Sequence, residues 1–447
     1  MQSNDDRKSD LGPSVGSPMN RRQVLTGVAL GAGVAALVGS PAAKAHSVAS
    51  GVYNVKVDGG AIGNGVADDT SKFQAAINSG LPVYVPPGTY RVVSTLTVAS
   101  RSFVMYGDGP DISMVYFEPS TASNFLNFSG RGIDQLMIRN LGISASGSST
   151  TFHDTAINAQ WSWTGLTHHT VPSAFIENVV IGQNGTTPRF NCGIHLHGGQ
   201  LCRILNCSFF QIREPRDAIG ILITATTDGP PGPENNACET QVVGCYFLFQ
   251  GMGIAIVGFA EGTRIANCSF VSVIRGIWID GTPVFSGSPQ APSYYGLGAI
   301  FIQDCHFDFF LFGVDAQNVW NFMVRGSHFL LETGAVSGAA CIKHARTNSP
   351  MLTGSENALY TNNIFYRNDN TSTVVFGIYV NGASADNRMK DILIDANRFC
   401  NQPFTHRVYL DTYTTRIRVT GTNLGNAGQG ATLDLGTANV VDSPSPA

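Results

Sequence analysis

Two aspartates lie in short segments that share one pattern, a glycine followed by alternating apolar and variable residues. Residues 276–280 read GIWID and residues 313–317 read GVDAQ, so that Asp280 and Asp315 occupy variable positions. Two carboxyl groups held about 6.5–9.5 Å apart can protonate a leaving group and activate a water molecule, as in inverting glycosidases. We therefore predict that Asp280 and Asp315 are a catalytic acid and base. The alternative is that both are ordinary aspartates at the ends of turns.

Other variable positions of the same pattern carry side chains that suit the recognition of a sugar chain. Aromatic faces accept the apolar C–H surfaces of sugars, and amides and imidazoles bind hydroxyl groups. The predicted substrate-binding residues are Trp278, His195, His197, Gln317, Tyr379, Asn381 and Tyr409. The alternative is a polar, solvated face that binds no ligand.

The two histidines also raise the question of a metal site. His195 and His197 would point to the same side of one strand, about 7 Å apart. No third ligand is evident near them, and the chain has no Cys-x-x-Cys spacing. We therefore predict that both histidines bind hydroxyl groups, and that the protein uses no metal and no cofactor.

The elements that must position these side chains follow from an internal repeat. Residues 204–209 read ILNCSF, and the pattern returns as VVGCYF at 242–247, IANCSF at 265–270 and IQDCHF at 302–307. Copies recur after 22 to 38 residues, and each is followed by a strand with period-2 alternation. This repeat predicts an all-β fold, a single-stranded, right-handed parallel β-helix with asparagine at a fixed turn. A leucine-rich horseshoe is the alternative, but leucine is sparse and no helix follows each strand.

Stacked turns of a β-helix place equivalent residues about 4.8 Å apart. Asp280 and Asp315 would lie one turn apart and two residues out of step, with about 8 Å between them. Cys192 and Cys202 are the pair that would form a disulfide, if one exists. The cysteines of the repeat should instead form a buried ladder of reduced thiols, comprising Cys207, Cys245, Cys268 and Cys305.

The composition excludes one large class of function. Charged residues make up 13% of the chain, against about 25% in an average soluble domain. The net charge of −4 leaves no excess of basic side chains, which nucleic-acid binding requires. The 50 glycines among 447 residues suit many short strands joined by tight turns.

Residues 1–45 have the features of an export signal. Arg21 and Arg22 precede an apolar run of about 15 residues, shorter than the roughly 20 that span a bilayer. Residues 43–45 read AKA, a cleavage site of small residues. The paired arginines favour twin-arginine export, with an ordinary secretory signal or an uncleaved anchor as the alternative. We predict a secreted or periplasmic protein with no membrane attachment after cleavage.

The N-terminal region resembles a known family. Residues 57–70 read VDGGAIGNGVADDT and residues 83–90 read VYVPPGTY. These motifs resemble the N-terminal motif of the pectate-lyase-like superfamily, shared by rhamnogalacturonase and epimerase relatives and by phage tailspikes. The resemblance implies a parallel β-helix that acts on a polysaccharide, and its likeness to tailspikes also allows for a homotrimer.

The same motif contains a short helix and sets the domain boundaries. Asp68 or Asp69 should cap a helix that has Phe73 and Ile77 on one face. That helix would plug the open end of the stack. The predicted parts are an export signal at 1–45, an N-terminal cap and first rung at 46–92, the β-helix at 93–420 and a C-terminal cap or tail at 421–447.

The resemblance to the polygalacturonase branch implies two more catalytic residues. The catalytic turns of that branch read Asn-Thr-Asp, Asp-Asp, Gly-His-Gly and Arg-Ile-Lys. In similar places this chain keeps one aspartate, Asp217, and one arginine, Arg275. The missing carboxylates argue against ordinary polygalacturonase activity, so either the substrate has changed or the catalytic centre has moved.

These observations predict a carbohydrate-active enzyme that cleaves glycosidic bonds of a polysaccharide by hydrolysis with paired carboxylates. Three alternatives stay open: β-elimination on a uronate-containing glycan, intramolecular fructosyl transfer as in inulin fructotransferases, and glycan binding without catalysis as in tailspike-like proteins. Elimination would need cationic side chains near the groove, for which the chain offers Arg213, Arg216, Arg275, Lys343 and Arg367.

Overall fold

The computed structural model describes most of the chain that follows the predicted export signal. The described residues are 51–145, 153–163, 172–182, 190–210, 218–225, 237–258, 260–281, 297–347, 356–368, 373–385, 387–401, 404–422 and 432–441. Within these ranges no helix has the length and apolar character that a membrane crossing requires. The export signal predicted at 1–45 lies outside the described residues and stays a prediction.

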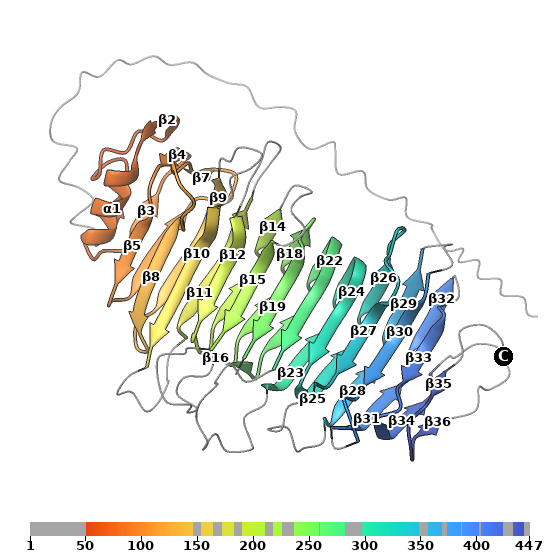
Figure 1. Ribbon diagram of the computed structural model, residues 1–447. Coiled ribbons are helices and arrows are strands. Elements are labelled where there is room, and N and C mark those ends of the chain that lie inside the picture. Colours follow the sequence, from red (N-terminus) through yellow and green to blue (C-terminus); the bar gives the residue numbers. More distant parts are fainter. Residues whose placement is uncertain are drawn as a thin grey trace, which may run out of the picture. The chain divides into compact units, whose positions relative to one another are not determined.

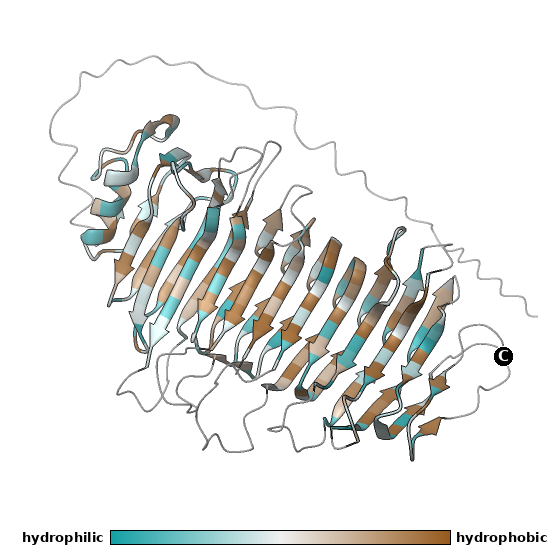
Figure 2. Ribbon diagram, in the orientation of Figure 1, coloured by the Kyte–Doolittle hydropathy of each residue, from teal (hydrophilic) through white to brown (hydrophobic). Residues whose placement is uncertain are grey.

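The described chain winds into a parallel β-helix, as the repeat predicts. Each turn contributes short strands that pair in parallel with those of the turns before and after it, which gives three rows of strands (Figure 1). The brown and teal bands along the strands in Figure 2 follow the alternation of apolar and polar residues. Because inward positions are apolar in every row, one continuous core runs along the stack.

Row A carries the Gly-Ile strands. Its strands are β5 (Leu96–Ala99), β8 (Leu126–Arg131), β10 (His153–Ser162), β12 (Phe190–His197), β15 (Ile219–Thr224), β19 (Met252–Val257), the second half of β22 (Ser269–Asp280) and of β24 (His306–Gln317), β27 (Ala339–Ala345), β30 (Val375–Asn381), β33 (His406–Leu410) and β35 (Leu433–Asp434).

Row B precedes the asparagine turn. It comprises β1 (Tyr53–Asn54), β3 (Val83–Val85), β6 (Phe103–Gly107), the first half of β9 (Leu136–Ala145) and of β11 (Ala174–Ile181), β13 (Arg203–Leu205), β17 (Gln241–Val243), β21 (Arg264–Ala266), β23 (Leu297–Gln303), β25 (Val319–Arg325), β28 (Ala358–Thr361), β31 (Met389–Asp395), β34 (Thr414–Thr420) and β36 (Val440–Val441).

Row C follows the asparagine turn. It comprises β2 (Asn64–Asp68), β4 (Gly88–Val92), β7 (Ser113–Phe117), the second halves of β9 and β11, β14 (Ser208–Phe210), β18 (Tyr246–Leu248), the first halves of β22 and β24, β26 (His328–Leu331), β29 (Ile364–Arg367) and β32 (Arg398–Asn401). A separate small sheet pairs β16 (Ala237–Cys238) with β20 (Ala260–Glu261).

The turn between rows B and C requires the left-handed backbone region. Asn140, Asn178, Asn206 and Asn267 adopt φ angles of 51–53° there, a conformation that asparagine tolerates better than most residues. The Asn178 Nδ2 group donates a hydrogen bond to Asn140 Oδ1 at 2.9 Å. Asparagines on neighbouring turns therefore hydrogen-bond along the stack at this pair.

The core contains the cysteine ladder that the repeat predicts, together with a ladder of phenylalanine rings. Cys207, Cys245, Cys268 and Cys305 are buried and unpaired. Cys192 and Cys202 are also free thiols, so they form no disulfide. Phenylalanine rings stack on successive turns with centroids 4.6–5.1 Å apart. The stacked rings belong to Phe209, Phe247, Phe270, Phe307, Phe329, Phe365 and Phe399.

The phenylalanine ladder explains the glycine that begins the row A pattern. A Cβ atom on Gly253 would lie 2.4 Å from Phe270 Cδ1 and 2.6 Å from the carbonyl oxygen of Gly276. Such contacts are far shorter than van der Waals distance, so only glycine lets the strand pass this close to the ring.

A helix forms in the N-terminal motif, at α1 (Thr70–Asn78). Phe73 and Ile77 are buried on one face, as the spacing predicts. Asp69 occupies the N-cap position, but its carboxylate accepts hydrogen bonds from the backbone N–H groups of Ile62 and Gly63 at 2.8 and 2.9 Å rather than from the helix. Figure 1 shows α1 beside β3 and β5. That α1 plugs the end of the stack stays a prediction.

Candidate functional site

The outward side chains of row A line up along the β-helix. The register pairs Trp278 with Asp315, Asp315 with Lys343, Lys343 with Tyr379, and Tyr379 with Tyr409. A second line, two residues further along each strand, starts with Asp280 beside Gln317 and reaches Asn381. The predicted relation between Asp280 and Asp315, one strand apart and two residues out of step, is the one that the register shows.

Asp315 lies buried between two cationic side chains. Its side chain is 2% exposed, with Arg275 Nη1 3.8 Å from Oδ2 and Lys343 Nζ 3.3 Å from Oδ1. The side chains of Arg275 and Lys343 are 28% and 22% exposed, so each cation also reaches the surface. Two positive charges therefore border one buried negative charge at the centre of the row.

Phe312 supports both cations from the same side. Lys343 Nζ lies 4.8 Å and Arg275 Cζ 5.5 Å from the centroid of its ring. The face of an aromatic ring attracts cations through its quadrupole, most strongly where water is excluded. Phe312 and Asp315 thus hold the two cationic groups in place. Asp280 is half-buried and lies two residues beyond Trp278, on the strand beside Asp315.

An aromatic cluster continues the row beyond Lys343. Its rings are Phe376 and Tyr379 of β30 and His406 and Tyr409 of β33, with centroids 4.9–5.8 Å apart. Burial raises the pKa of Tyr379, and the charge of Asp411 adds to this increase. The cluster includes both tyrosines that the sequence predicts as substrate-binding.

The two predicted histidines lie elsewhere on row A. The rings of His195 and His197 stack with centroids 5.7 Å apart, and His195 Nε2 lies 2.9 Å from Thr224 Oγ1. Burial lowers the pKa of His195 to about 4, with a smaller effect from His197, so this ring is neutral at pH 7. β15 and β19 separate these histidines from β22, so they do not join Asp280 and Asp315. Among the described residues, no group of three His, Cys, Asp or Glu side chains could hold a metal ion.

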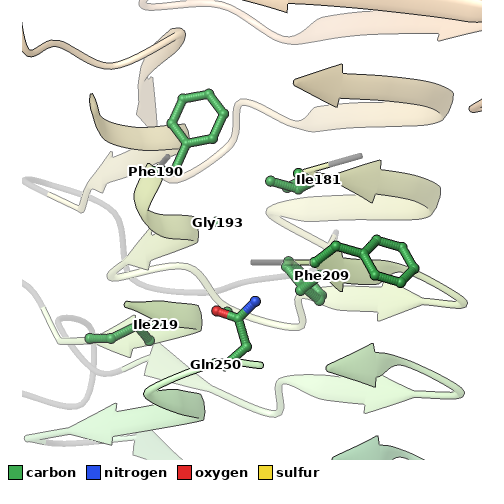
Figure 3. A pocket seen from close by; sticks show the side chains of 9 residues that line it. Ile181, Phe190, Gly193, Phe209, Ile219 and Gln250 are labelled. Carbon is green, nitrogen blue, oxygen red and sulfur yellow. The ribbon is translucent and has the colours of Figure 1, made fainter. Parts of the chain in front are cut away.

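Asp217, the aspartate implied by the polygalacturonase resemblance, lies outside the described residues. The strand that follows it, β15, borders a small hollow where rows C and A meet. Figure 3 shows Gln250 between Ile219 and Phe209 in this hollow, with Phe190 and Ile181 above. The described lining is mainly apolar, unlike the charged centre around Asp315.

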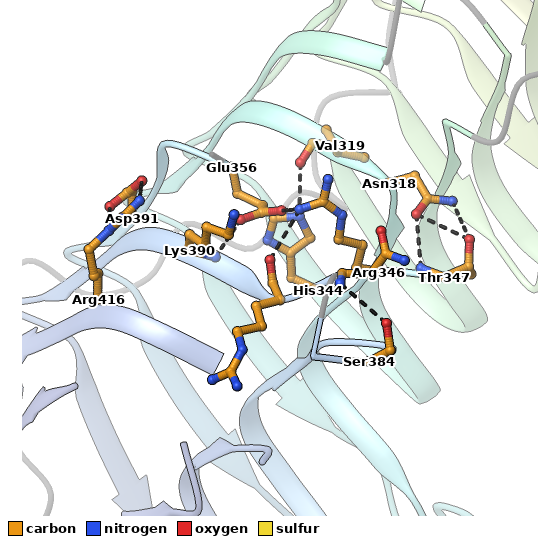
Figure 4. A network of polar contacts seen from close by, with 12 residues as sticks. Asn318, Val319, His344, Arg346, Thr347, Glu356, Ser384, Lys390, Asp391 and Arg416 are labelled. Carbon is orange, nitrogen blue, oxygen red and sulfur yellow. Dashed lines mark hydrogen bonds and ion pairs between the residues drawn. The ribbon is translucent and has the colours of Figure 1, made fainter. Parts of the chain in front are cut away.

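A buried polar network supports the strand that carries Lys343. His344 donates from Nε2 to the carbonyl oxygen of Val319 at 3.1 Å and accepts at Nδ1 from the Tyr360 hydroxyl. Arg346 Nη1 lies 2.9 Å from Glu356 Oε1 (Figure 4). Burial lowers the pKa of His344 to about 4 and raises that of Glu356 to about 7. These buried groups are paired with one another through hydrogen bonds and an ion pair. The network therefore fixes the end of β27 from its buried side.

A second pair of carboxyl groups lies on row C. Asp308 is on β24, and Glu332 directly follows β26. Burial raises the pKa of Asp308 to about 8, and Glu332 adds to the increase through a hydrogen bond and its charge. This pair is on a different row from Asp280 and Asp315, so it belongs to a different surface.

Sequence reasoning missed several residues of the central site. Phe312, Phe376 and His406 lie three residues before the variable positions of their strands, a place that the Gly-Ile pattern does not single out. Lys343 was visible only as one of several cations, because its strand reads Cys341-Ile342 where the pattern has Gly-Ile. Aligning that segment with its neighbours would have placed Lys343 between Asp315 and Tyr379.

A parallel β-helix with a row of charged and aromatic side chains is the class of protein that this architecture defines. Residues 52–280, just over half of the chain, match the family described as rhamnogalacturonase A/epimerase, pectate lyase-like. The chain belongs to this family. A stretch of 58 residues, 13% of the chain, is 41% identical to the pre-neck appendage protein of Bacillus phage B103, of which it spans only 7%.

Solved structures with the same fold come from phages and from a bacterium. Dettilon tailspike protein has a TM-score of 0.56 at 11% identity, covering 89% of this chain and 69% of its own. Tailspike protein 2 of the Escherichia coli O157:H7 bacteriophage CAB120 has a TM-score of 0.52 at 12% identity. The match covers 83% of this chain and 46% of the tailspike chain. The A-module of a mannuronan C-5 epimerase from Azotobacter vinelandii has a TM-score of 0.50 at 15% identity. The match covers 88% of this chain and 100% of the epimerase module. At these identities the likeness shows the fold alone.

Proposed function

We propose that this protein is a carbohydrate-active enzyme that binds a polysaccharide along row A and cleaves its glycosidic bonds. The observation that carries the proposal is the line of outward side chains from Trp278 to Tyr409, in which aromatic faces flank a charged centre. Aromatic rings pack on the apolar faces of sugars, and convergent polar groups bind hydroxyls and act on the bond. The membership in a rhamnogalacturonase and epimerase family supports the same class of substrate.

Hydrolysis is the reaction that we propose first. Asp280 and Asp315 have the relative register that two carboxylates need for inverting hydrolysis, since a diagonal across one strand spacing is about 8 Å. Asp280 is the carboxylate nearer the surface, whereas Asp315 is paired with Arg275 and Lys343. In this reaction Asp280 would protonate the leaving glycosidic oxygen, Asp315 would take the proton of the attacking water, and Arg275 and Lys343 would bind hydroxyl groups of the sugar.

Elimination is a second candidate, and the cation pair is the observation that favours it. A lyase must neutralise a uronate carboxylate and remove a proton beside it, and Arg275 and Lys343 offer two adjacent cationic groups. The two reactions differ in their products, because only elimination leaves an unsaturated uronate.

Product analysis tests the function. The mature protein is incubated with panels of plant, bacterial and fructan polysaccharides, and the products are examined by chromatography and ultraviolet absorbance. New reducing ends without an unsaturated product support hydrolysis, and an unsaturated uronate supports elimination. Tight binding without any cleavage would contradict both reactions and leave a glycan-binding protein.

Export by the twin-arginine route, a secreted or periplasmic location and a homotrimeric assembly are further proposals. Each rests on the sequence, on residues 1–45 for export and on the tailspike resemblance for the trimer. Sedimentation velocity of the purified mature protein gives the number of chains directly.

A further inference from the structure

The aromatic cluster beyond Lys343 has the make-up of a separate binding site. Phe376 and Tyr379 come from β30, and His406 and Tyr409 come from β33, the next strand of row A (Figure 1). The Tyr379 and Tyr409 centroids are 5.0 Å apart, and the Phe376 ring lies 4.9 Å from the first and 5.3 Å from the second. All four side chains are half-buried, so their rings pack on one another while part of each stays open to solvent.

Polar side chains border this aromatic surface. Asn381 occupies the outward position of β30 that follows Tyr379, and Asp411 directly follows β33. Asp411 is close enough for its charge to contribute to the raised pKa of Tyr379. An apolar floor with an amide and a carboxylate at its edge matches the two surfaces of a sugar ring, which are C–H groups on its face and hydroxyls at its rim.

The cluster lies at a fixed distance from the charged centre. Lys343 pairs with Tyr379, and Tyr379 with Tyr409, so these rings are two and three strands from Asp315. Strand spacing makes these separations about 10 and 14 Å. In the opposite direction, the next outward residues after Trp278 are Ala255 and Leu222, which offer no aromatic face.

We propose that Phe376, Tyr379, His406 and Tyr409 form a distal subsite that binds a sugar ring two to three strand spacings from the cleavage centre. This inference rests on the proposed function and deepens it. The substrate is then a glycan chain that runs along the axis of the β-helix, over β22 to β33. Long chains gain the contacts of the subsite, and chains too short to span from Asp280 to Tyr409 do not.

The experiment compares long and short oligosaccharides of the glycan that the product analysis identifies. Tyr409→Ala removes one ring of the floor, Tyr409→Phe keeps it, and Tyr366→Ala removes a half-buried outward tyrosine on row C as a matched control. Binding is measured by isothermal titration calorimetry on the Asp280→Asn background, and KM and kcat are measured with Asp280 intact. Melting temperatures confirm that each variant is folded.

The subsite predicts a loss that depends on chain length. Tyr409→Ala should raise Kd and KM for long chains about tenfold, the usual effect of deleting an aromatic anchor. The loss should be confined to long chains, because the shortest cleaved oligosaccharide does not reach the subsite. Tyr409→Phe should lose less than Tyr409→Ala because it keeps the ring, and Tyr366→Ala should stay within about twofold of the unsubstituted protein for all lengths.

Other outcomes separate the subsite from the function. Equal loss for short and long chains, or no loss for either, would overturn the subsite while cleavage by the unsubstituted protein upholds the proposed function. If the unsubstituted protein binds and cleaves no glycan, the proposed function and the subsite are both overturned. If Tyr409→Ala melts well below the other variants, the same comparison with His406→Ala decides the outcome.

Discussion

At the scale of single residues, the environment of Asp315 determines how the charged centre can work. The carboxylate is almost fully buried, so it has little contact with solvent. The charged groups beside it are those of Arg275 and Lys343. Asp315 is the register neighbour of Trp278 and lies between two cations. Asp315 therefore holds the two cations in addition to its proposed role as the second carboxylate, while the half-buried Asp280 is better placed to meet a substrate.

Substitution of the two aspartates should separate these roles. Asp280→Asn should lower kcat by about 10²–10⁴-fold, because general acid–base catalysis is lost, and should leave the melting temperature unchanged. Asp315→Asn should lower kcat and also the melting temperature, because it leaves two partly buried cations without their counter-charge. Kinetics and thermal unfolding of both variants check this. Asp217→Asn is the control. A large loss from Asp217→Asn with little from Asp280→Asn would place the chemistry near β15 instead.

Asp308 gives a prediction about pH. Its pKa is raised from an ordinary 3.8 to about 8, chiefly by burial and then by Glu332. The folded protein therefore binds a proton that the unfolded chain releases, so stability falls as pH rises from about 4 to about 8. Asp308→Asn removes this dependence, and should raise the melting temperature relative to the unsubstituted protein more at pH 8 than at pH 4.

Asp304→Asn is the matched control for this measurement, because Asp304 is an exposed aspartate in the turn before the same strand. It should leave the pH dependence as it is. An Asp308→Asn variant that melts in parallel with the unsubstituted protein from pH 4 to pH 8 would contradict the raised pKa.

At the scale of elements, six row A strands carry a glycine that packs against a phenylalanine ring of row C. The phenylalanine rings that these glycines meet also stack on one another along row C. This close packing fixes the position of the strand just before its outward residues. The side chains of the candidate site thus depend on a contact in the core.

Gly253→Ala tests that dependence. The added Cβ would overlap the Phe270 ring, so the variant should lose about 1–3 kcal/mol of unfolding free energy, the usual cost of overpacking a core. Chemical denaturation measures this loss. Phe270→Leu on the same background should recover part of it, because the smaller side chain relieves the overlap. Strictly additive effects in this double-mutant cycle would show that the two residues do not interact.

At the scale of the whole molecule, the β-helix acts as an extended platform. Stacked turns contact mainly their neighbours, so one row can change its outward residues from turn to turn without altering the core. Row A uses this freedom to combine imidazoles near β12, charges near β24 and aromatic rings near β33. Such a line of different groups suits a ligand that is itself a chain.

Export of the whole molecule gives a further prediction. Replacing Arg21 and Arg22 together with lysine should block translocation, because the twin-arginine route recognises this pair. Cell fractionation and immunoblotting of the unsubstituted and substituted proteins measure the effect. Normal export of the lysine variant would assign residues 1–45 to the ordinary secretory route.

The sequence alone determined the β-helix, because the residues that form its core recur at equivalent positions of the repeat. The same positions on every turn must be apolar, glycine or asparagine, so the pattern survives in the order of residues. It also determined which side chains of row A point outward, since the alternation along a strand fixes the face. The neighbours Trp278 and Asp315 could therefore be paired before any coordinates were known.

Only the tertiary structure decided what surrounds those side chains. Arg275 and Phe312 each directly precede the glycine of their strand, and Lys343 is on a strand that lacks the pattern, so sequence spacing did not bring them to Asp315. Their contacts depend on the stacking of β22, β24 and β27, which places side chains from three turns around one carboxylate. Burial and charge balance arise from this three-dimensional neighbourhood, and no single segment of the chain contains them.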